Sequence, residues 1–593
     1  MSAQELITGH LDLWTGATAT KSKSGRGSSS KTELVGIQKL RELILELATK
    51  GKLSIQNPQT ESANELMAEV QSIKRGLEDA GKIKKQKRSP PIEHEKLTFS
   101  IPKNWAWVRL AELTEKIGSG ATPRGGKSAY VTNGIPFFRS QNIWNDGLNL
   151  TDVAYIPVET HGKMANTHVY PDDILLNITG ASLGRTTIVP CEIEEANVSQ
   201  HVTIIRIIPP VSREFIHYLL LSPYVQAMVW GRQVGMAREG LSKKVLELFE
   251  LPLPPLEEQH RIVQKVDELM ALCDQLEQQT SDQIAAHGTL VDTLLGTLTQ
   301  SQSATELSEN WTRLAAHFDT LFTTEQSIDK LKQTILQLAV MGLLVKRNSE
   351  DEPAEKFVDR LKIEKARQIN NKEIKAQAKM KSAHMNLPPH KMPNHWFAAN
   401  LDEISHVQGG IQKQPKRRPI QNKHPYLRVA DVQRGFLMDC SDLPEFELFN
   451  DEIKQYALKE DDILVVEGNG SAEEIGRCAI WDGRVSNCVY QNHLMRVRPI
   501  APESCKYLSL YLNSPSGIEE MKRLAVTSSG LYNLSVGKIR SISVPLPPLL
   551  EQHRIVNKVD ALMALCDQLK ERLNQSSKTL CQLAETIVEN ALQ

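Results

Sequence analysis

The chain has 593 residues, 40% of them apolar, which is enough for several domains with their own cores. No run of about 18 uninterrupted apolar residues is present, which excludes a membrane-spanning helix. The N-terminus also lacks the basic and then apolar pattern of a signal peptide, so we expect a cytoplasmic protein. The formal net charge of −1 counts against a nucleic-acid-binding protein unless basic residues gather locally or partner chains supply them.

The eight cysteines are scattered, with no Cys-x-x-Cys pair and no Cys/His group at zinc-binding spacing. Cys273 and Cys566 stand within helical apolar patterns, where a thiol serves as a small buried hydrophobe. We therefore expect neither a disulfide nor a metal site.

In chain order, residues 1–31 end in a stretch rich in Ser, Gly and Lys, which predicts a flexible segment. A helix follows, with an apolar stripe made of Ile37, Leu40, Ile44 and Leu47. Gly51 stands where a helix C-cap is expected. A second, polar helix is predicted over residues 63–80, and residues 82–88 with Pro90 and Pro91 are typical of a basic linker.

The next segment is rich in Gly, Pro, Asn and short apolar runs, which indicates a mixed α/β module. Strands are predicted over residues 174–178 and 202–208, and a helical stretch near residues 215–230. Asp172 and Asp173 precede the first of these strands, where capping a turn is a better interpretation than holding a metal. Residues 120–128 resemble a phosphate-binding loop, but Gly126 stands where its lysine should be, so we interpret them as a loop of the module.

A heptad helix closes this half of the chain and predicts a coiled coil. Pro252, Pro254 and Pro255 precede it, where they end a strand and are tolerated at a helix start. Its apolar seam contains Ile262, Val266, Leu269, Cys273 and Leu276 and continues less regularly through Leu294 and Leu298.

The whole pattern then occurs a second time. The segment LPLPPLEEQHRIVQKVDELMALCDQLEQ from Leu251 returns almost unchanged as VPLPPLLEQHRIVNKVDALMALCDQLKE from Val544. Weaker copies keep nearly the same spacing, such as IPFFRSQNI from Ile135 and HPYLRVADV from His424. The helices are similar in the two halves, whereas the α/β modules diverge between shared landmarks. One duplicated unit of this size predicts a pseudo-two-fold molecule.

The second copy predicts the same elements. A stripe of Ile328, Leu331, Ile335 and Leu338 ends at Gly342, and a polar helix is expected over residues 354–379. Strands are predicted over residues 463–466 and 494–497, and a helix over residues 505–524. The final heptad seam has Ser576 as its one polar break and contains Ile555, Val559, Leu562, Cys566, Leu569, Leu573, Leu580, Leu583 and Ile587.

The borders of both modules resemble those of the specificity subunits of type I restriction-modification enzymes. Each module opens with Ile or Met followed by Pro-x-x-Trp, at residues 101–105 and 392–396. Each closes with Leu-Ser and then P-L-P-P-L-x-E-Q-x-R-I-V, ending at Val263 and Val556. The resemblance runs from about Lys31 to the C-terminus, and the length and N-terminal extension look most like the IB subgroup.

This resemblance implies α/β modules plus long helices: two globular α/β target-recognition domains separated by an antiparallel coiled coil, pseudo-two-fold from an internal duplication. We place these domains at residues 100–255 and 391–548. The remaining regions are an N-terminal extension and helical region (1–99), a central helical region (256–390) and a C-terminal helix (549–593).

The same resemblance implies a DNA-recognition subunit that catalyses nothing itself. In that family each domain reads one half of a split, asymmetric target in double-stranded DNA. Two modification subunits bind S-adenosylmethionine and methylate adenine, and two restriction subunits use ATP and Mg. A coiled-coil helix of ~40 residues spans about 60 Å, so the helices can act as a ruler between half-sites. Inserting four residues after Gln279 should therefore add about 6 Å and lengthen the preferred gap.

Base reading needs side chains with paired donors and acceptors: Arg suits guanine, and Asn or Gln suits adenine. We expect them in loops between short strands. The candidates in the first domain are Arg124, Lys127, Arg139, Gln141, Asn142, Arg185, Gln200 and His201. Those in the second are Lys416, Arg417, Arg418, Arg428, Arg477, Gln491, Asn492 and His493. Candidates for binding phosphate, with a merely solvated surface as the alternative, are Lys243, Lys244, Lys538 and Arg540.

Two other function classes fit the sequence less well. A single-chain enzyme acting on DNA is disfavoured because no Asn-Pro-Pro-aromatic motif for a flipped adenine is present; residues 386–390 (NLPPH) have the wrong order. His94-Glu95 likewise lacks the second His of a zinc protease. A coiled-coil adaptor that binds only proteins would fit the near-neutral charge, but it gives no reason for two divergent modules rich in Gly, Asn and Arg.

Overall fold

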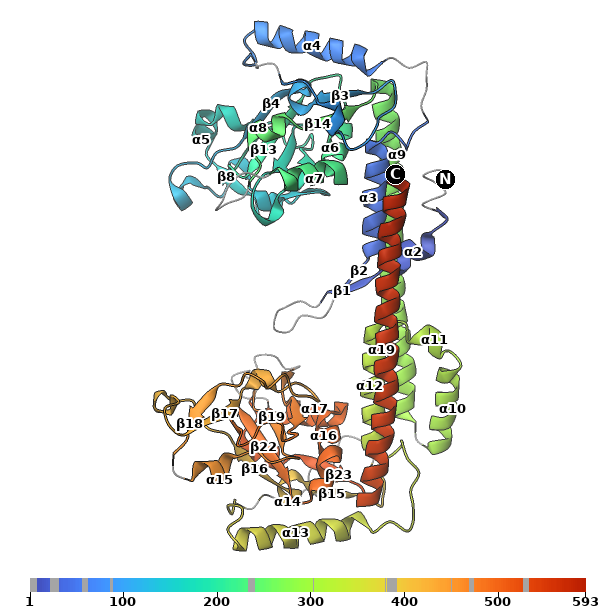
Figure 1. Cartoon of the computed structure of the whole chain (residues 1–593), viewed down its shortest axis with the longest axis vertical. Helices are drawn as coiled ribbons and strands as arrows, with labels where there is room; N and C mark the ends of the chain where they lie inside the picture. Colours follow the sequence, from blue (N-terminus) through green and yellow to red (C-terminus); the bar gives the residue numbers. More distant parts are fainter. Residues whose placement is uncertain are drawn as a thin grey trace. The chain divides into compact units, whose positions relative to one another are not determined.

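A computed structural model of the chain describes residues 8–21, 31–55, 62–85, 89–232, 240–301, 303–378, 380, 392–449, 451–468, 474–525 and 533–592. The chain forms two compact units (Figure 1). The first comprises Met1–Ala19, Thr32–Ser281 and Ser577–Gln593, and the second comprises Thr20–Lys31 and Asp282–Ser576. Most of the segment predicted to be flexible, and the near-miss motif at residues 386–390, lie outside the described residues.

The α/β domain of the first unit is built on two four-stranded sheets. An antiparallel sheet has the order β11-β10-β13-β4, with β4 (Thr114–Ser119), β10 (Ile174–Asn177), β11 (Thr186–Ile188) and β13 (Val202–Ile207). A mixed sheet has the order β8-β5-β12-β9, with β5 (Ile135–Phe138), β8 (Ala154–Ile156), β9 (His168–Val169) and β12 (Ala196–Val198). The two predicted strands of this module are confirmed as β10 and β13.

Short strands and helices complete this domain. Strands β3 (Ala106–Arg109) and β14 (Glu250–Leu253) pair antiparallel, which joins the start of the domain to its end. The helices are α5 (Val158–Lys163), α6 (Arg213–Leu221), α7 (Pro223–Gly231) and α8 (Lys243–Glu247). The helical stretch predicted near residues 215–230 is confirmed, and it is divided into two helices. Ser222 ends α6, its Oγ accepts a hydrogen bond from the Val225 amide at 3.3 Å, and Pro223 starts α7.

The second unit contains a matching α/β domain. Its antiparallel sheet has the order β16-β22-β19-β20, with β16 (Ser405–Gly409), β19 (Ile463–Val466), β20 (Cys478–Ile480) and β22 (Leu494–Pro499). A three-stranded sheet has the order β18-β17-β21, with β17 (Lys423–Leu427), β18 (Glu445–Glu447) and β21 (Val489–Tyr490). Strands β15 (Phe397–Asn400) and β23 (Ser543–Leu546) close the domain as β3 and β14 do in the first. Both predicted strands are confirmed, as β19 and β22.

The helices of the second domain repeat the same division. They are α14 (Leu401–Ile404), α15 (Glu452–Tyr456), α16 (Cys505–Asn513), α17 (Pro515–Ala525) and α18 (Val536–Arg540). The helix expected over residues 505–524 is again two helices, because Ser514 leaves the helical conformation and Pro515 begins α17.

The helical part of the first unit centres on α3 (Val35–Thr49), with the polar helix α4 (Ala63–Asp79) beside the domain. This unit also takes in the first part of α9 (Leu256–Gln300) and the last part of α19 (Leu549–Leu592). The predicted stripe of α3 is buried, with no member more than 3% exposed. Arg41 on its other side forms ion pairs with Asp274 at 2.6 Å and Glu277 at 2.9 Å on α9.

The second unit is built in the same way from α12 (Glu325–Val340), the rest of α9 and the first part of α19. One apolar core contains the stripe of α12 together with Leu298 of α9 and Ile555 of α19. Lys332 pairs with Asp567, at the positions that correspond to Arg41 and Asp274. The other helices are α10 (Ala304–Ala315), α11 (Phe318–Leu321) and α13 (Ala354–Asn370). None of the described helices is long and apolar enough to cross a membrane.

Two helical predictions need correction. The polar helix α13 ends at Asn370 rather than near residue 379, because Lys372 adopts a left-handed φ of 60°. Leu583 does not lie in the seam of α19: it is 48% exposed, and Ala584 and Val588 are buried instead. A straight helix repeats every 3.6 residues, so a strict heptad pattern drifts off the buried face toward its end.

The N-terminal extension contains a repeated element that the sequence analysis missed. Helix α2 (Leu11–Gly16) begins after His10, and α11 begins after His317. Each of these histidines has its carbonyl oxygen bonded to two amides of the following turn. Trp14 and Leu321 then bury the corresponding positions. The duplication therefore includes residues GHLDLW and AHFDTL, well before α3 and α12.

The repeated motifs at the domain borders contact one another. Trp105 donates its indole N–H to the Glu258 carboxylate at 3.0 Å, and Trp396 donates to Glu551 at 3.0 Å. All four side chains are buried. Each pair ties the opening Pro-x-x-Trp motif of a domain to the helix that closes it, which explains why these residues recur in both halves.

Candidate DNA interface

The loops at one end of each antiparallel sheet hold most of the candidate residues. In the first domain, β4 and β10 end where β11 and β13 begin, as the pairing of Ser119 with Thr203 and of Asn177 with Val202 shows. The parallel strands β5 and β12 also end here together, as the hydrogen bond from the Ser199 amide to the Phe138 carbonyl shows. We call the loops at this end of each sheet the reading edge. The antiparallel sheet brings together residues that are far apart in the sequence.

His201 and Gln200 lie at the reading edge of the first domain. His201 Nδ1 is 2.7 Å from Thr179 Oγ1, and the Gln200 amide nitrogen is 3.2 Å from His201 Nε2. Thr122 also bonds to Gln200. Gly120 permits this close packing, since a Cβ there would lie 2.0 Å from the Val198 carbonyl oxygen. Gln200 is exposed and His201 partly so, which leaves polar atoms available to a ligand.

Arg139, Gln141 and Asn142 occupy a single turn after β5. Asn142 is buried, its Oδ1 accepts the Arg139 amide, and its Nδ2 donates to the Asn149 and Asp152 carbonyls at 3.0 Å. Asn142 therefore holds the loop together. Arg139 and Gln141 both reach the Asp152 carboxylate, at 3.3 and 2.6 Å, and keep exposed surface.

Arg185 precedes β11 and stacks on an aromatic ring. Its guanidinium carbon lies 3.9 Å from the centre of the Trp144 ring. Trp144 is 41% exposed, and its N–H donates to the Gln141 carbonyl. Stacking fixes the plane of the guanidinium while leaving its edges free to donate hydrogen bonds. Trp144 is not among the candidates predicted from the sequence.

The second domain places its candidates at the corresponding points. Arg428 follows β17 and forms an ion pair with Asp431, whose carboxylate raises the pKa of Arg428 by accepting its hydrogen bonds. Arg477 precedes β20, as Arg185 precedes β11, and donates to Gln433 Oε1 at 3.1 Å. Asp431 and Gln433 occupy the positions of Asn142 and Trp144 in the repeat. The same frame therefore carries different side chains in the two domains.

Gln491, Asn492 and His493 form the remaining part of this edge. The side chain of His493 is 62% exposed and forms an ion pair with Glu467 at 3.0 Å. In the equivalent loops of the first domain, His201 instead contacts Thr179. Gly410 corresponds to Gly120: a Cβ there would lie 2.2 Å from the Gln491 carbonyl oxygen. Thr179 and Glu467 were missed by sequence reasoning; they are neighbours in the equivalent loop but not at the same position of the repeat.

Several other candidates lie in different surroundings. Arg417 is 12% exposed and forms a two-pronged ion pair with Glu452, at 2.8 and 2.9 Å, which joins its loop to α15. Its neighbours Lys416 and Arg418 are exposed. Arg540 is buried, and its ion pair with Asp402 makes it unsuitable for binding phosphate. Lys538 donates to backbone carbonyls.

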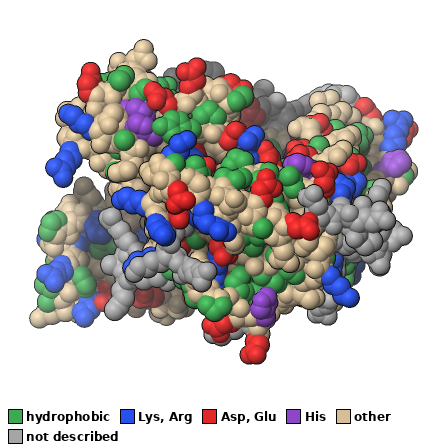
Figure 2. Space-filling model, turned by 90° about the horizontal axis from the view of Figure 1, so that it is seen from above, with side chains coloured by type: hydrophobic (Ala, Val, Ile, Leu, Met, Phe, Trp, Pro, Cys, Tyr) green, Lys and Arg blue, Asp and Glu red, His purple; other side chains and the backbone are tan. Residues whose placement is uncertain are grey.

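The last candidates complete the first domain. Arg124 is exposed in the loop after Gly120, and Lys243 and Lys244 are exposed at the start of α8. The backbone of Lys127 lies in a 3-10 turn, Gly126–Ala129, and its side chain is outside the described residues. Figure 2 shows Lys and Arg interspersed with Asp and Glu over the face drawn, as expected for a net charge of −1.

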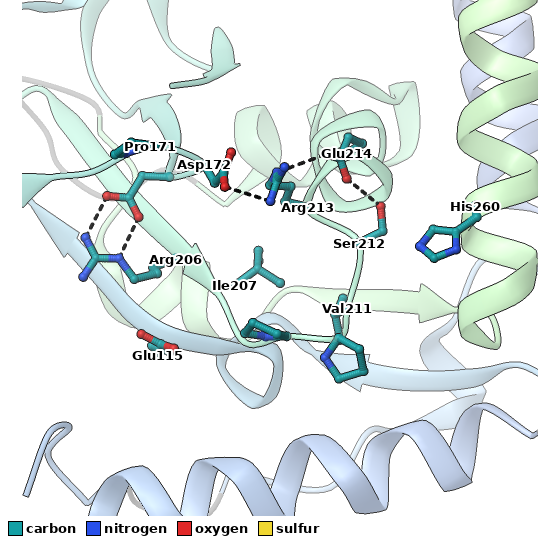
Figure 3. Close-up of a pocket in the computed structure, with 13 residues that line it drawn as sticks. Glu115, Pro171, Asp172, Arg206, Ile207, Val211, Ser212, Arg213, Glu214 and His260 are labelled. Atoms are coloured by element: carbon teal, nitrogen blue, oxygen red, sulfur yellow. Dashed lines mark hydrogen bonds and ion pairs between the residues drawn. The ribbon is translucent and has the colours of Figure 1, made fainter. Parts of the chain in front are cut away.

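The opposite end of each sheet is locked by buried ion pairs. Asp173 accepts two hydrogen bonds from Arg206 at 2.7 Å, and Asp462 accepts two from Arg498 at 2.6 Å. Asp172 and Asp461 adopt left-handed φ values of 71° and 68°, so these pairs of acids do cap a turn. A cavity of about 410 Å³ lies beside the first pair, with Arg213 and His260 on its walls (Figure 3).

The described residues offer little for covalent or metal chemistry. Burial raises the pKa of Cys478 and Cys488 to about 12, so both thiols stay protonated. Among the described residues, no group of three His, Cys, Asp or Glu side chains could hold a metal ion.

Comparison with known proteins assigns the family. The model of the type I restriction modification DNA specificity domain matches residues 102–286 and again residues 393–577. The chain belongs to the type I restriction-modification specificity subunits. Each match begins at the Pro-x-x-Trp motif and includes one reading edge, so the specificity domain and the structural repeat coincide.

Known specificity subunits are similar over the whole chain. The EcoEI specificity subunit of Escherichia coli is 34% identical over 608 residues, and the EcoAI specificity subunit of the same organism is 33% identical over 613; both alignments cover 100% of each chain. A solved HsdS subunit from Thermoanaerobacter tengcongensis is 18% identical, with a TM-score of 0.37 over 84% of this chain and 98% of its own. A chain from a type I R-M system has a TM-score of 0.47, at 18% identity and over 84% and 99%. Specificity subunits recognise the DNA target and are not the catalytic components of these enzymes.

Proposed function

We propose that this specificity subunit reads a bipartite, asymmetric DNA target, with one α/β domain for each half. The two target-recognition domains are proposed to extend over residues 100–255 and 391–548. The observation that carries this proposal is the pair of reading edges. Both place an arginine before β11 or β20, and an amide side chain followed by a His (Gln200-His201 or Asn492-His493) before β13 or β22. The partner side chains differ, as with Trp144 and Gln433. Different side chains on one frame are what two different half-sites require.

Within each edge, the proposed roles follow from exposure. Arg185, Gln200 and His201 in the first domain, and Gln491, Asn492 and His493 in the second, have accessible polar atoms near several strand ends. We propose that these side chains contact base edges. Arg124, Lys127, Lys416 and Arg418 are proposed to contact the sugar-phosphate backbone, as point charges in loops usually do. Asn142, Arg417 and Arg477 support the loops, and any contact that they make with DNA is secondary.

The helical parts are proposed to assemble the partner subunits. We expect two modification subunits, which bring S-adenosylmethionine and methylate adenine, and two restriction subunits, which bring ATP and Mg. No cofactor is proposed on this chain, and its proposed location is the cytoplasm. The IB subgroup stays a prediction.

Modified-base sequencing of the host genome, with and without this gene, tests the proposal. We expect a split motif with methylated adenine on both strands that disappears on deletion. A strain carrying Arg185→Ala should keep the sequence preference at one half of the motif and lose part of the preference at the other. Unchanged methylation, with the modification subunit expressed, would contradict the proposed function and favour a protein-only adaptor.

A further inference from the structure

An open, strongly basic groove lies beside the sheet of the first domain. It has a volume of about 990 Å³ and runs between the end of α4, strand β4 and the start of α8. Figure 1 shows α4 along this side of the first unit. Seven of the side chains that line it are Lys or Arg, and two are Glu. The cations are Lys82, Lys84, Lys85, Lys116, Arg206, Lys243 and Lys244.

Most of this positive charge is not neutralised within the chain. Arg206 is paired with Asp173, and Lys243 lies 3.5 Å from Glu247. For the other five lysines no carboxylate lies within 4.0 Å among the residues that the structure describes. Burial lowers the pKa of Lys116 and the nearby Arg206 lowers it further, while the carboxylate of Asp173 acts in the opposite direction. An anion in the groove would relieve both effects.

The second domain shows what a filled groove looks like. There the segment after α13 lies over the corresponding strand: Gln377 donates to the Val407 carbonyl at 2.8 Å, and Ile374 packs against the core. Arg540 and Lys365 both pair with Asp402, which neutralises them. The corresponding residue in the first domain is Ala111, and Val536 and Gly537 replace Lys243 and Lys244. The charges near the second groove are thus neutralised within the chain, whereas the first groove is lined mostly by lysines that have no carboxylate partner among the described residues.

The position of the open groove points to its ligand. Lys243 and Lys244 follow Gly240, which bridges to Thr179 at the reading edge, so the groove begins where the candidate base contacts end. Its cations are almost all lysines, which bind phosphate as point charges, and contacts with phosphate carry no base specificity. We propose that the groove binds backbone phosphates of the DNA duplex that flanks the bases read by the first domain. This inference rests on the proposed function of the reading edge.

Salt-dependent binding tests it. The full-length chain, in complex with its modification subunit, would carry Lys84→Ala, Lys85→Ala and Lys244→Ala, three exposed positions. The matched control carries Lys346→Ala, Arg347→Ala and Lys356→Ala, which are exposed in the second unit. Dissociation constants would be measured from 50 to 300 mM salt with a duplex of the mapped target and with a scrambled duplex. Each phosphate contact contributes about 0.9 to the slope of log K against log salt concentration.

We expect the slope to fall by about 2 to 3 for both duplexes, with the preference for target over scrambled DNA unchanged within about twofold. The control variant should keep the wild-type slope. An unchanged slope in the groove variant would overturn the proposal. Loss of the modification subunit without a change in slope would also overturn it and would assign the groove to an acidic partner segment. If the triple variant unfolds, Lys244→Ala alone should lower the slope by about 1.

The result also separates the two proposals. If the wild-type complex binds target and scrambled duplexes equally, the proposed reading function fails. The slope comparison would still decide whether the groove contacts phosphate, because that contact is independent of sequence.

Discussion

Arg417 and Arg418 are neighbours, yet the structure gives them different roles. Arg417 is anchored by Glu452, whereas Arg418 is exposed, and for Arg418 no ion pair occurs among the described residues. Changing both at once would mix two effects. Arg418→Ala should weaken DNA binding and leave the free energy of unfolding unchanged within about 0.5 kcal/mol.

Arg417→Ala should instead destabilise the second domain by about 1 to 3 kcal/mol, because it leaves the partly buried Glu452 carboxylate without its partner. Chemical denaturation and DNA titration of both variants would separate the roles, and Arg360→Ala on the exposed side of α13 serves as the control. Equal loss of stability in the Arg417 and Arg418 variants would contradict this assignment.

His406 on β16 gives the second domain a defined dependence on pH. It is 5% exposed, and burial lowers its pKa to about 4, with Arg496, Lys365, Arg498 and Arg540 adding repulsion. In the unfolded chain its pKa is near the ordinary 6.5. The folded state therefore binds a proton less readily, so stability is unaffected above pH 6.5 and falls as the pH drops from 6.5 toward 4.

At pH 5 this single group should cost about 2 kcal/mol relative to pH 7. His406→Gln removes the proton-binding site, so the variant should lose that much less stability than the wild type between the two pH values. Denaturation midpoints at pH 7 and pH 5 measure the difference, with His424→Gln as the control. A variant that loses as much stability as the wild type would show that His406 is not the titrating group.

At the scale of elements, Gly51 and Gly342 terminate α3 and α12 in the same way. Both adopt a left-handed φ, of 67° and 73°. A Cβ at Gly51 would lie 2.7 Å from Pro102, and one at Gly342 would lie 2.5 Å from Pro393. These helix ends therefore rest directly on the Pro-x-x-Trp motifs that open the two domains.

Replacing either glycine by Ala should destabilise its unit by at least about 1 kcal/mol, because the left-handed conformation is strained and the prolines must move. Gly76→Ala is the matched control: it lies within α4 with nothing within 4 Å of the new Cβ, so it should stabilise by about 0.5 to 1 kcal/mol. Denaturant titration of the three variants checks the signs. A stabilising Gly51→Ala would refute the packing described here.

Periodicity predicted these elements well, but it did not predict the contacts between distant loops. The buried stripes of α3 and α12 and strands β10, β13, β19 and β22 follow from local patterns that need no tertiary information. The helix breaks at Ser222 and Ser514 come from a capping Ser that is followed by Pro. This signal is present in the sequence, but the surrounding run of apolar residues favoured an unbroken helix. The pairing of Arg417 with Glu452 depends on how two loops close, which no local pattern encodes.

At the scale of the whole molecule, the two long helices are shared between the units. Residues of α9 up to Ser281 belong to the first unit and the rest to the second, and α19 crosses in the reverse order at Ser577. Each unit therefore combines the first part of its own long helix with the last part of the other. The near-identical segments from Leu251 and Val544 contain the first parts of these helices, and each lies within one unit and plays the same part there.

The sharing also refines the ruler prediction. Inserting four residues after Gln279 alone would lengthen α9 but leave α19 unchanged, so the cores that both helices complete would fall out of register. A matched insertion after Gln279 and after Arg572, the corresponding position of α19, keeps both cores intact. It adds about 6 Å of helix and a rotation of about 40°.

If the helices set the distance between the two reading edges, the preferred gap in the DNA target should grow by about two base pairs, since each pair rises about 3.4 Å. Binding selection from a library of spacer lengths, with the modification subunit present, measures this shift. The same four residues inserted in the exposed loop after Ser349 should leave the gap unchanged. The single insertion after Gln279 should reduce stability rather than move the optimum. A doubly extended protein that still prefers the original gap would mean that the partner subunits, and not the long helices, set the spacing.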